Sequence, residues 1–177
     1  PFRACIEKGG SRSIMTAYNS LEGSPCTAND WLLNQILKQE WGFNGFVISD
    51  ASATGGANVL HYTASDYADA GRKAIQNGLD VIFQTNYEHY KLFIAPFLDG
   101  TLKPEVIDAA VKRVLRAKFE LGLFDQPYLD EGVSKSVQPK HQDLAKKAAM
   151  ASIVLLKNQK KLLPLAPNTK IAVVGID

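Results

Sequence analysis

The fold class follows first from EWGFNGFVISD, which runs from Glu40 to Asp50. Phe46–Ile48 is an apolar, β-branched run between a glycine turn and a polar pair, which predicts a strand buried on both faces of a parallel sheet. Ser49 and Asp50 follow at the carboxyl end of this strand, where α/β folds place their active-site loops. Asp50 is therefore a candidate nucleophile or base, and the alternative is an Asp that caps the next segment through a backbone N–H.

One further strand is predicted before this stretch, at residues 13–18 (SIMTAY), and one after it, at residues 79–83 (LDVIF). A helix with a broad apolar stripe is predicted from Thr27 to Trp41, and a second helix, capped by Ser65, is predicted to end at Gly78. This alternation of strand and helix is typical of βαβ units and predicts an α/β protein with a parallel sheet. A longer helix is predicted from Pro104, because apolar residues then recur every three to four positions.

The character of the sequence changes after Phe124. Residues 125–139 contain prolines and a glycine, and their apolar residues show no helical or strand periodicity, as is typical of an interdomain linker. A helix is predicted from about His141 to Ala151. Ile171-Ala172-Val173-Val174-Gly175 predicts the first strand of a new parallel sheet. Because three strands are too few for a closed eight-stranded barrel, we expect the chain to be a segment of a larger protein.

Composition narrows the function classes. The chain has 177 residues and a formal net charge of +2 with both signs interspersed, which argues against a nucleic-acid partner. No apolar window reaches about 18 residues, so no membrane span is expected. Cys5 and Cys26 form neither a disulfide framework nor a metal pattern, and His61 and His89 stand singly, so no metal site is expected.

Five stretches together resemble glycoside hydrolase family 3, the β-glucosidase and β-xylosidase family. The stretch from Glu40 to Asp50 is similar to the family's Glu-Trp-Gly-Phe-x-Gly-x-Val-x-Ser-Asp signature, and SIMTAYN (residues 13–19) is similar to its strand that ends in Tyr-Asn. Residues 113–124 resemble the family's stretch after the barrel, with its Gly-Leu-Phe ending. SIVLLKN (residues 152–158) and LLPL (residues 162–165) resemble the approach to its second domain. The resemblance covers essentially the whole chain in the family's order.

The resemblance implies a fold and a division of the chain. Residues 1–124 would be the C-terminal part of a (β/α)8 TIM-type barrel, residues 125–169 a linker with a helix, and residues 170–177 the first strand of an α/β sandwich domain. The implied activity is that of a retaining, exo-acting β-glycoside hydrolase, a β-glucosidase or a β-xylosidase, that releases terminal non-reducing sugars. No cofactor is implied.

The resemblance also assigns site residues. Asp50 corresponds to the family's nucleophile, which would form the covalent glycosyl-enzyme, and Met15 and Tyr18 correspond to residues that line the sugar pocket. Met15 and Tyr18 point to opposite sides of an ideal strand, so both can line one site only if the strand ends or bends between them; Met15 as a core gap-filler remains open. The family's acid/base Glu lies beyond Asp177, so the isolated segment is expected to be inactive.

Two departures from the family concern the site. Ala51 stands where the family often has an aromatic or bulky residue, which removes a stacking surface for the sugar and predicts a pliable loop at residues 51–56. Lys140-His141 is not the family's sugar-binding Lys-His pair, which would precede this segment, and His141 is interpreted as structural or solvated.

Two rival interpretations remain. The first is a non-catalytic carbohydrate-binding or assembly fragment in which Asp50 is structural. The second is an aldolase-type lyase, which would need a catalytic lysine at a strand end, whereas Lys38, Lys73 and Lys91 all fall in helical stretches.

The resemblance implies an oligosaccharide or an aryl or alkyl β-glycoside as substrate, and the remaining barrel and sandwich parts of the parent protein as partners. The family's export habits favour a periplasmic or secreted protein, and no residue of this chain identifies the compartment. Nothing in the sequence separates glucosidase from xylosidase or sets the linkage or the oligomeric state.

Overall fold

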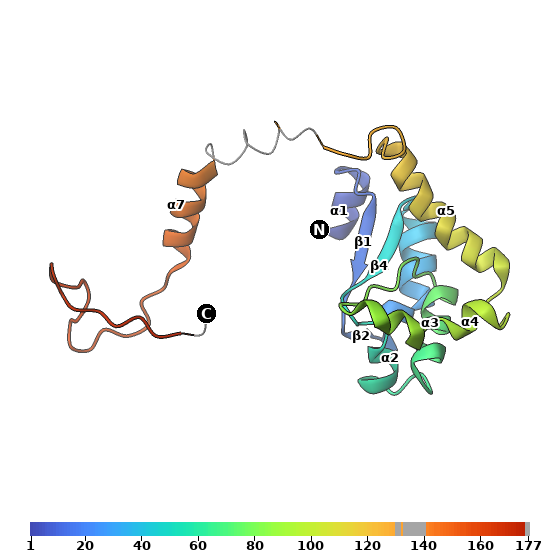
Figure 1. Cartoon of the computed structure of the whole chain (residues 1–177), viewed down its shortest axis with the longest axis horizontal. Helices are drawn as coiled ribbons and strands as arrows, with labels where there is room; N and C mark the ends of the chain where they lie inside the picture. The colour runs from blue at the N-terminus through green and yellow to red at the C-terminus, as the bar shows by residue number, and fades with distance from the viewer. Residues whose placement is uncertain (130–131, 133–140, 176–177) are drawn as a thin grey trace. The chain divides into compact units, whose positions relative to one another are not determined.

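The computed structural model describes residues 1–129, 132 and 141–175. The chain divides into two compact units, Pro1–Pro127 and Tyr128–Asp177 (Figure 1). The boundary falls inside the stretch 125–169 that the sequence predicts as a linker. What each part contributes to a complete protein stays a prediction.

A parallel sheet lies at the centre of the first unit. Strand β1 (Ser13–Thr16) pairs in parallel with β4 (Phe46–Ser49), in a register that runs from Ser13 opposite Phe46 to Thr16 opposite Ser49 (Figure 1). A parallel bridge between Ile48 and Val81 adds a third chain segment on the other side of β4. The α/β class and the parallel pairing predicted from the sequence are therefore confirmed.

The third strand is shorter than predicted, because side chains replace backbone partners on both sides of its bridge. The N–H of Val47 donates to Oδ2 of Asp80 at 2.8 Å. The N–H of Phe83 donates to Oγ of Ser49 at 2.9 Å. The predicted strand 79–83 thus lies beside β4 and contributes one bridge instead of a regular ladder.

Helix η2 (Trp31–Glu40) begins later than predicted and has a different geometry. Thr27 is buried in a short 3-10 turn, η1 (Cys26–Ala28), and does not cap the helix. Oδ1 of Asn29 instead accepts the N–H of Leu32 at 3.0 Å. The N–H of Trp41 donates to the carbonyl of Ile36, five residues earlier, which is the spacing of a π-helix.

Helix α3 (Tyr67–Gln76) is capped by Asp66, one residue after the predicted Ser65. Oδ1 of Asp66 accepts the N–H of Asp69 at 2.8 Å, and Oδ2 of Asp69 accepts the N–H of Ser65 at 3.1 Å. The two carboxylates thus form a reciprocal capping arrangement. Asp66, and not Ser65, therefore carries the cap of α3.

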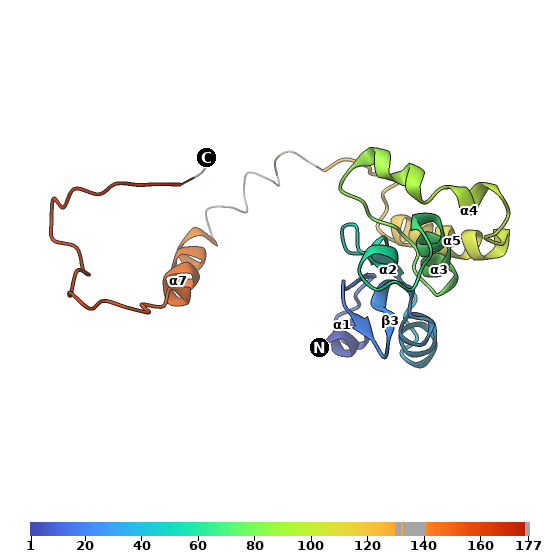
Figure 2. The ribbon, with the colours of Figure 1, turned by 90° about the horizontal axis from the view of Figure 1, so that it is seen from below.

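The remaining elements of the first unit surround this frame. Helix α5 (Pro104–Glu120) begins at Pro104, as predicted. Residues 87–98 form two short helices, η3 (Tyr87–Leu92) and α4 (Ala95–Leu98), with Pro96 in the first turn of α4. In Figure 2, α3, α4 and α5 lie next to one another. The short elements are α1 (Phe2–Glu7), β2 (Ser20–Leu21), β3 (Ser24–Pro25) and α2 (Gly56–Val59), with β2 and β3 paired antiparallel.

The core forms where η2 and α3 pack on one face of β4. Val47 is completely buried there, while its neighbours Phe46 and Ile48 are half-buried. Burial of this apolar surface is the main stabilising contribution to the unit. The buried cluster comprises Ala28, Leu33, Leu37, Phe43, Val47, Ala74, Ile75, Leu79 and Leu102.

The second unit contains the helix α7 (Gln142–Ser152), close to the predicted limits. Ile171–Gly175, predicted as a strand, forms none in this structure, and its large side chains are exposed. A strand needs a neighbour to accept and donate its backbone hydrogen bonds, and no described residue pairs with this segment. Residues 130–131 and 133–140 of the predicted linker lie outside the described residues. Within the described residues, no helix combines the length and the apolar character that a membrane span requires.

Candidate active site

Asp50 directly follows β4 and is held there by its backbone. Its N–H donates to the carbonyl of Thr16, the last residue of β1, at 3.3 Å, and its carbonyl accepts the N–H of Ala53 at 3.1 Å. The carboxylate is half-buried, and its Oδ1 accepts the N–H of Ala51 at 2.7 Å. No hydrogen bond to Oδ2 occurs within the described residues. One oxygen therefore holds the turn, as the capping alternative requires, and the other remains available for chemistry.

Tyr18 is brought to the loop that follows Asp50. Strand β1 ends at Thr16, so the chain turns before Tyr18, and the Tyr18 hydroxyl donates to the carbonyl of Ala51. About half of the Tyr18 side chain remains exposed. Asp50 and Tyr18 thus belong to one cluster at the carboxyl ends of β4 and β1, linked through Ala51.

His61 adds a second link that the sequence does not reveal. Its Nε2 lies 2.8 Å from the backbone carbonyl of Tyr18. The loop after β4 is therefore joined to the segment after β1 both at its start, through Ala51, and at its far end, through His61. The sequence alone does not indicate this role of His61, because its partner is a backbone carbonyl 43 residues earlier in the chain.

The loop after Asp50 is not the pliable segment that its small residues predict. Ala53–Ala57 is buried, and successive tight turns connect Asp50 to helix α2. The N–H of Ser52 donates to the carbonyl of Phe83 at 3.0 Å. A Cβ at Gly55 would lie 2.4 Å from Cε1 of Tyr67, so this glycine permits close packing against α3. The small residues allow this loop to pack tightly. Composition alone does not predict this, because small residues also occur in flexible loops.

Met15 is placed in a different environment from Asp50. It lies on β1 opposite Ile48 and lines an apolar hollow of about 220 Å³ with Leu32, Ile36 and Trp41. Its side chain is 59% exposed. The contacts around Met15 are those of an apolar gap next to η2, and its sugar-pocket role stays a prediction.

Ser49, the first residue of the Ser-Asp pair, has a structural position. It is completely buried, its N–H donates to the carbonyl of Val81 at 2.9 Å, and its Oγ accepts the N–H of Phe83. These bonds join β4 to the third chain segment immediately before Asp50. Ser49 therefore fixes the point from which the Asp50 carboxylate projects.

Another carboxylate, that of Asp80, lies at the opposite end of β4. Its Oδ1 accepts from Nε and Nη2 of Arg113 at 2.8 and 2.7 Å, and Nζ of Lys38 lies 3.7 Å away. The side chain of Asp80 is completely buried. Burial lowers the pKa of Lys38 to about 8, although the charge of Asp80 acts to raise that pKa. The signal in the sequence is an acid inside the apolar run 79–83, because a buried carboxylate requires a partner.

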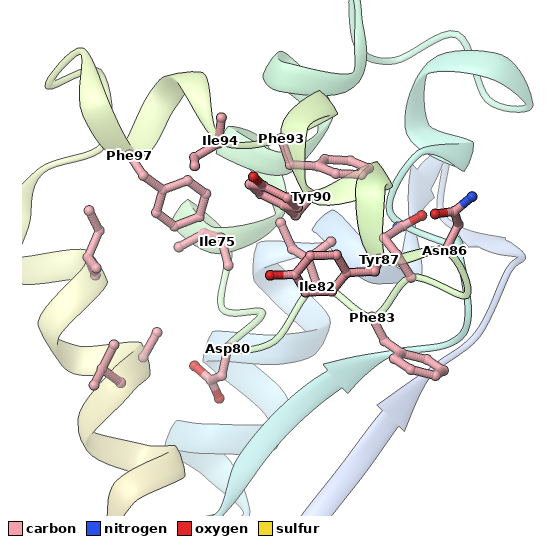
Figure 3. A pocket seen from close by; sticks show the side chains of 14 residues that line it. Ile75, Asp80, Ile82, Phe83, Asn86, Tyr87, Tyr90, Phe93, Ile94 and Phe97 are labelled. Atoms are coloured by element: carbon pink, nitrogen blue, oxygen red, sulfur yellow. The ribbon is translucent and has the colours of Figure 1, made fainter.

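A hollow of about 420 Å³ lies between the third chain segment, η3, α4 and α5 (Figure 3). Ile75, Ile82 and Phe97 form part of its apolar wall, and Phe83, Tyr87 and Tyr90 lie toward one side. Asp80 contributes the carboxylate seen at its base, whereas Asp50 does not line it. This hollow is therefore separate from the candidate nucleophile.

The lysines considered for lyase chemistry lie on helices. Lys38 is on η2, Lys73 on α3 and Lys91 on η3. Lys73 donates to the carbonyl of Thr63 and forms an ion pair with Asp69, while Lys91 pairs with Glu88. None of the three lies at the carboxyl end of a strand beside Asp50. In the part of the chain that the structure describes, no group of three or more His, Cys, Asp or Glu side chains could hold a metal.

Comparison with known proteins identifies the family. Residues 1–117 match the family model described as the glycosyl hydrolase family 3 N terminal domain. The chain belongs to glycoside hydrolase family 3. It is 36% identical over 183 residues to a periplasmic β-glucosidase of Salmonella typhimurium, covering 99% of this chain and 23% of that protein. It is 32% identical over 185 residues to a β-xylosidase of Formosa agariphila, covering 99% of this chain and 26% of that protein.

A solved structure agrees with this assignment. A β-glucosidase from Erythrobacter marinus superimposes with a TM-score of 0.74 at 35% identity, covering 93% of this chain and 22% of that protein. The chain thus spans about a quarter of the length of the family 3 relatives it matches. The matched region 1–117 includes Asp50 and Tyr18, and the resemblance stated from the sequence is confirmed at the level of the family.

Proposed function

We propose that this family 3 chain is the late-barrel part of a retaining, exo-acting β-glycoside hydrolase in which Asp50 is the nucleophile. The observation that supports this most directly is the carboxylate itself, which projects from the end of a buried strand with Oδ2 free of hydrogen bonds among the described residues. A nucleophile on a rigid strand end keeps its aim, because packing fixes the backbone beneath it.

The reaction we propose has two steps. An oxygen of Asp50 attacks the anomeric carbon, the glycosidic bond breaks, and a carboxylic acid protonates the leaving oxygen. The same acid, now a carboxylate, takes a proton from water, and the water oxygen attacks the anomeric carbon to release the sugar and restore Asp50. This chemistry requires no cofactor. The acid/base carboxyl group would come from outside residues 1–177.

Tyr18 has a role in this proposal that its contacts support. Its hydroxyl proton is used in the bond to Ala51, so the hydroxyl oxygen is free to accept from a sugar hydroxyl, and its half-exposed ring offers a face for sugar C–H groups. Met15 lines the neighbouring apolar hollow and would reach a sugar only at the edge of the site. The relatives include both β-glucosidases and β-xylosidases, so the substrate class we propose is a terminal β-linked glucose or xylose.

A graft tests this proposal. Residues 1–177 would replace the matching segment of the Salmonella β-glucosidase, and turnover of an aryl β-glucoside and an aryl β-xyloside would be measured. We expect Asp50→Asn to lower kcat by at least about 10³-fold, because a covalent nucleophile is lost. Asp108→Asn, which neutralises an exposed aspartate on α5, is the control and should leave kcat unchanged.

Labelling identifies the nucleophile directly. A 2-deoxy-2-fluoro glycoside should trap the glycosyl-enzyme of the active graft, and the peptide that carries the label should contain Asp50. A label on another residue, or full turnover by the Asp50→Asn graft, would exclude the proposed role. Full turnover would instead favour the non-catalytic interpretation, in which Asp50 only holds its loop through Ala51.

We also propose that the 177-residue chain alone is inactive. The support is that the chain spans 23% of the length of the Salmonella relative and that the resemblance places the acid/base Glu outside residues 1–177. Measurable, Asp50-dependent hydrolysis of an aryl β-glycoside by the purified chain would contradict this.

A further inference from the structure

A hollow lined by basic side chains lies at the end of β4 opposite Asp50. It has a volume of about 280 Å³, and its cationic members are Lys38 from η2 together with Lys112, Arg113 and Arg116 from α5. Phe43, Asn44 and Ala109 complete its wall. Phe43 and Asn44 precede β4, whereas Asp50 follows it, so this basic hollow is far along the strand from the candidate nucleophile.

We propose that the basic hollow binds a phosphate-like oxyanion, either free or as the phosphate group of a small molecule. The first argument is its charge. Four cationic side chains line it, and Asp80 pairs with two of them, Arg113 and Lys38. An anion in the hollow would compensate charges that the described part of the protein leaves uncompensated.

Lys112 and Arg116 carry most of this excess charge. They are exposed, lie one turn apart on α5 and form no ion pair within the described residues. Asp108 lies one turn before Lys112, yet no ion pair joins the two. Like charges at this spacing destabilise a helix, and an anion bound between them would remove that repulsion.

The other two cations are already held in place. Arg113 uses Nε and Nη2 to bind Asp80, which leaves Nη1 without a hydrogen bond among the described residues. Lys38 donates to the carbonyl of Gly78 and keeps two ammonium protons for further contacts. Because these side chains are fixed before a ligand arrives, binding costs little of their conformational entropy.

The chemistry of the wall favours a tetrahedral oxyanion. Guanidinium and ammonium donors match phosphate oxygens in charge and geometry, and the wall has no exposed carboxylate of its own. The volume of about 280 Å³ is several times the roughly 30 Å³ that one water occupies in the liquid, which leaves room for an anion larger than water. Ala109, which is half-buried in the wall, could contact the carbon skeleton of a phosphorylated small molecule in that space.

Binding is tested on the 177-residue chain by two-dimensional ¹H–¹⁵N NMR. Inorganic phosphate and glucose 6-phosphate are titrated separately at pH 7, each against sodium chloride at matched ionic strength. We expect saturable shifts at residues 43–44 and 112–116 with both probes and none of this kind with chloride. Tighter binding of glucose 6-phosphate would assign the site to a phosphorylated molecule, and tighter binding of inorganic phosphate would assign it to the free ion.

Variants locate the site. Lys112→Ala and Arg116→Ala should each weaken phosphate binding by about tenfold, because each removes a charge-assisted hydrogen bond. Lys118→Ala is the matched control, since it removes the same charge from the same helix without lining the hollow. Shifts that follow ionic strength whatever the anion, or equal affinity in Lys112→Ala, Arg116→Ala and the wild type, would overturn the proposal. Both residues are exposed, and circular dichroism would verify that the variants remain folded.

Discussion

Replacement of Asp80 by asparagine is expected to be the most destabilising polar substitution in the first unit. The Asp80 carboxylate is completely buried and compensates Arg113 and Lys38, whose side chains are only 26% and 13% exposed. Asparagine can still accept the N–H of Val47, but it leaves both cations without a counter-charge. Breaking a buried ion pair on one side costs about 3–5 kcal/mol, and we expect about 3 kcal/mol because one bond survives.

That cost is large against the total stability of a domain, about 5–15 kcal/mol. With a urea m-value of about 2 kcal/mol per molar, the unfolding midpoint of Asp80→Asn should fall by about 1.5 M. Trp31 and Trp41, at the two ends of η2, provide a fluorescence signal for the titration. The assay therefore reads the unit in which the substitution lies.

An exposed ion pair gives the control. Arg12 and Glu120 approach to 3.0 Å with side chains 57% and 39% exposed, so Glu120→Gln should cost about 0–1 kcal/mol. If Asp80→Asn shifts the unfolding midpoint no more than Glu120→Gln does, then the buried Asp80 carboxylate does not contribute the expected stability of about 3 kcal/mol. Lys38→Met in the Asp80→Asn background should recover part of the loss, because it removes one uncompensated charge.

Three further outcomes are expected from urea unfolding. The pKa of Lys38 is about 8 in the folded protein and 10.5 in the ordinary group, so the unfolded state binds more protons between these two pH values. The free energy of unfolding of the wild type should therefore rise by about 1.4 kcal/mol per pH unit from pH 8 to pH 10.5. Lys38→Met should not show this rise. Asp66→Ala removes the α3 cap and should cost about 1 kcal/mol, whereas Asp66→Ser should retain most of it. Gly45→Ala places a Cβ 2.1 Å from the carbonyl oxygen of Arg12 and should cost about 1–3 kcal/mol, while Gly56→Ala, whose Cβ has only ordinary contacts, should not.

The sequence predicts best what local periodicity determines. The parallel pairing of β1 with β4, the start of α5 at Pro104 and the limits of α7 follow from apolar patterns and helix signals. The family also follows, because its motifs occur in order along the whole chain. The helix limits depend on residues near one another in the chain, and the parallel pairing follows from the alternation of strand and helix.

The features that the sequence does not predict depend on contacts between distant residues. The third strand is reduced to a bridge because Asp80 and Ser49 supply side-chain partners to residues more than 30 positions away. The loop after Asp50 is buried because Gly55 admits the ring of Tyr67. The strand predicted at 171–175 has no partner among the described residues. In each case tertiary contacts, not local preference, decide the outcome.

Asp50 and Asp80 show how position separates two carboxylates of the same kind. Asp80 lies at the amino end of the third chain segment. Arg113 binds one of its oxygens, the backbone of Val47 binds the other, and the buried carboxylate stabilises the fold. Asp50 occupies the carboxyl end, where Ala51 uses one oxygen only. Neutralising Asp80 should therefore reduce turnover of the graft only as far as it unfolds the protein, whereas neutralising Asp50 should abolish turnover in a protein that unfolds at the same urea concentration as the wild type. If the two variants lost activity and stability in parallel, the strand end would not distinguish a catalytic carboxylate from a structural one.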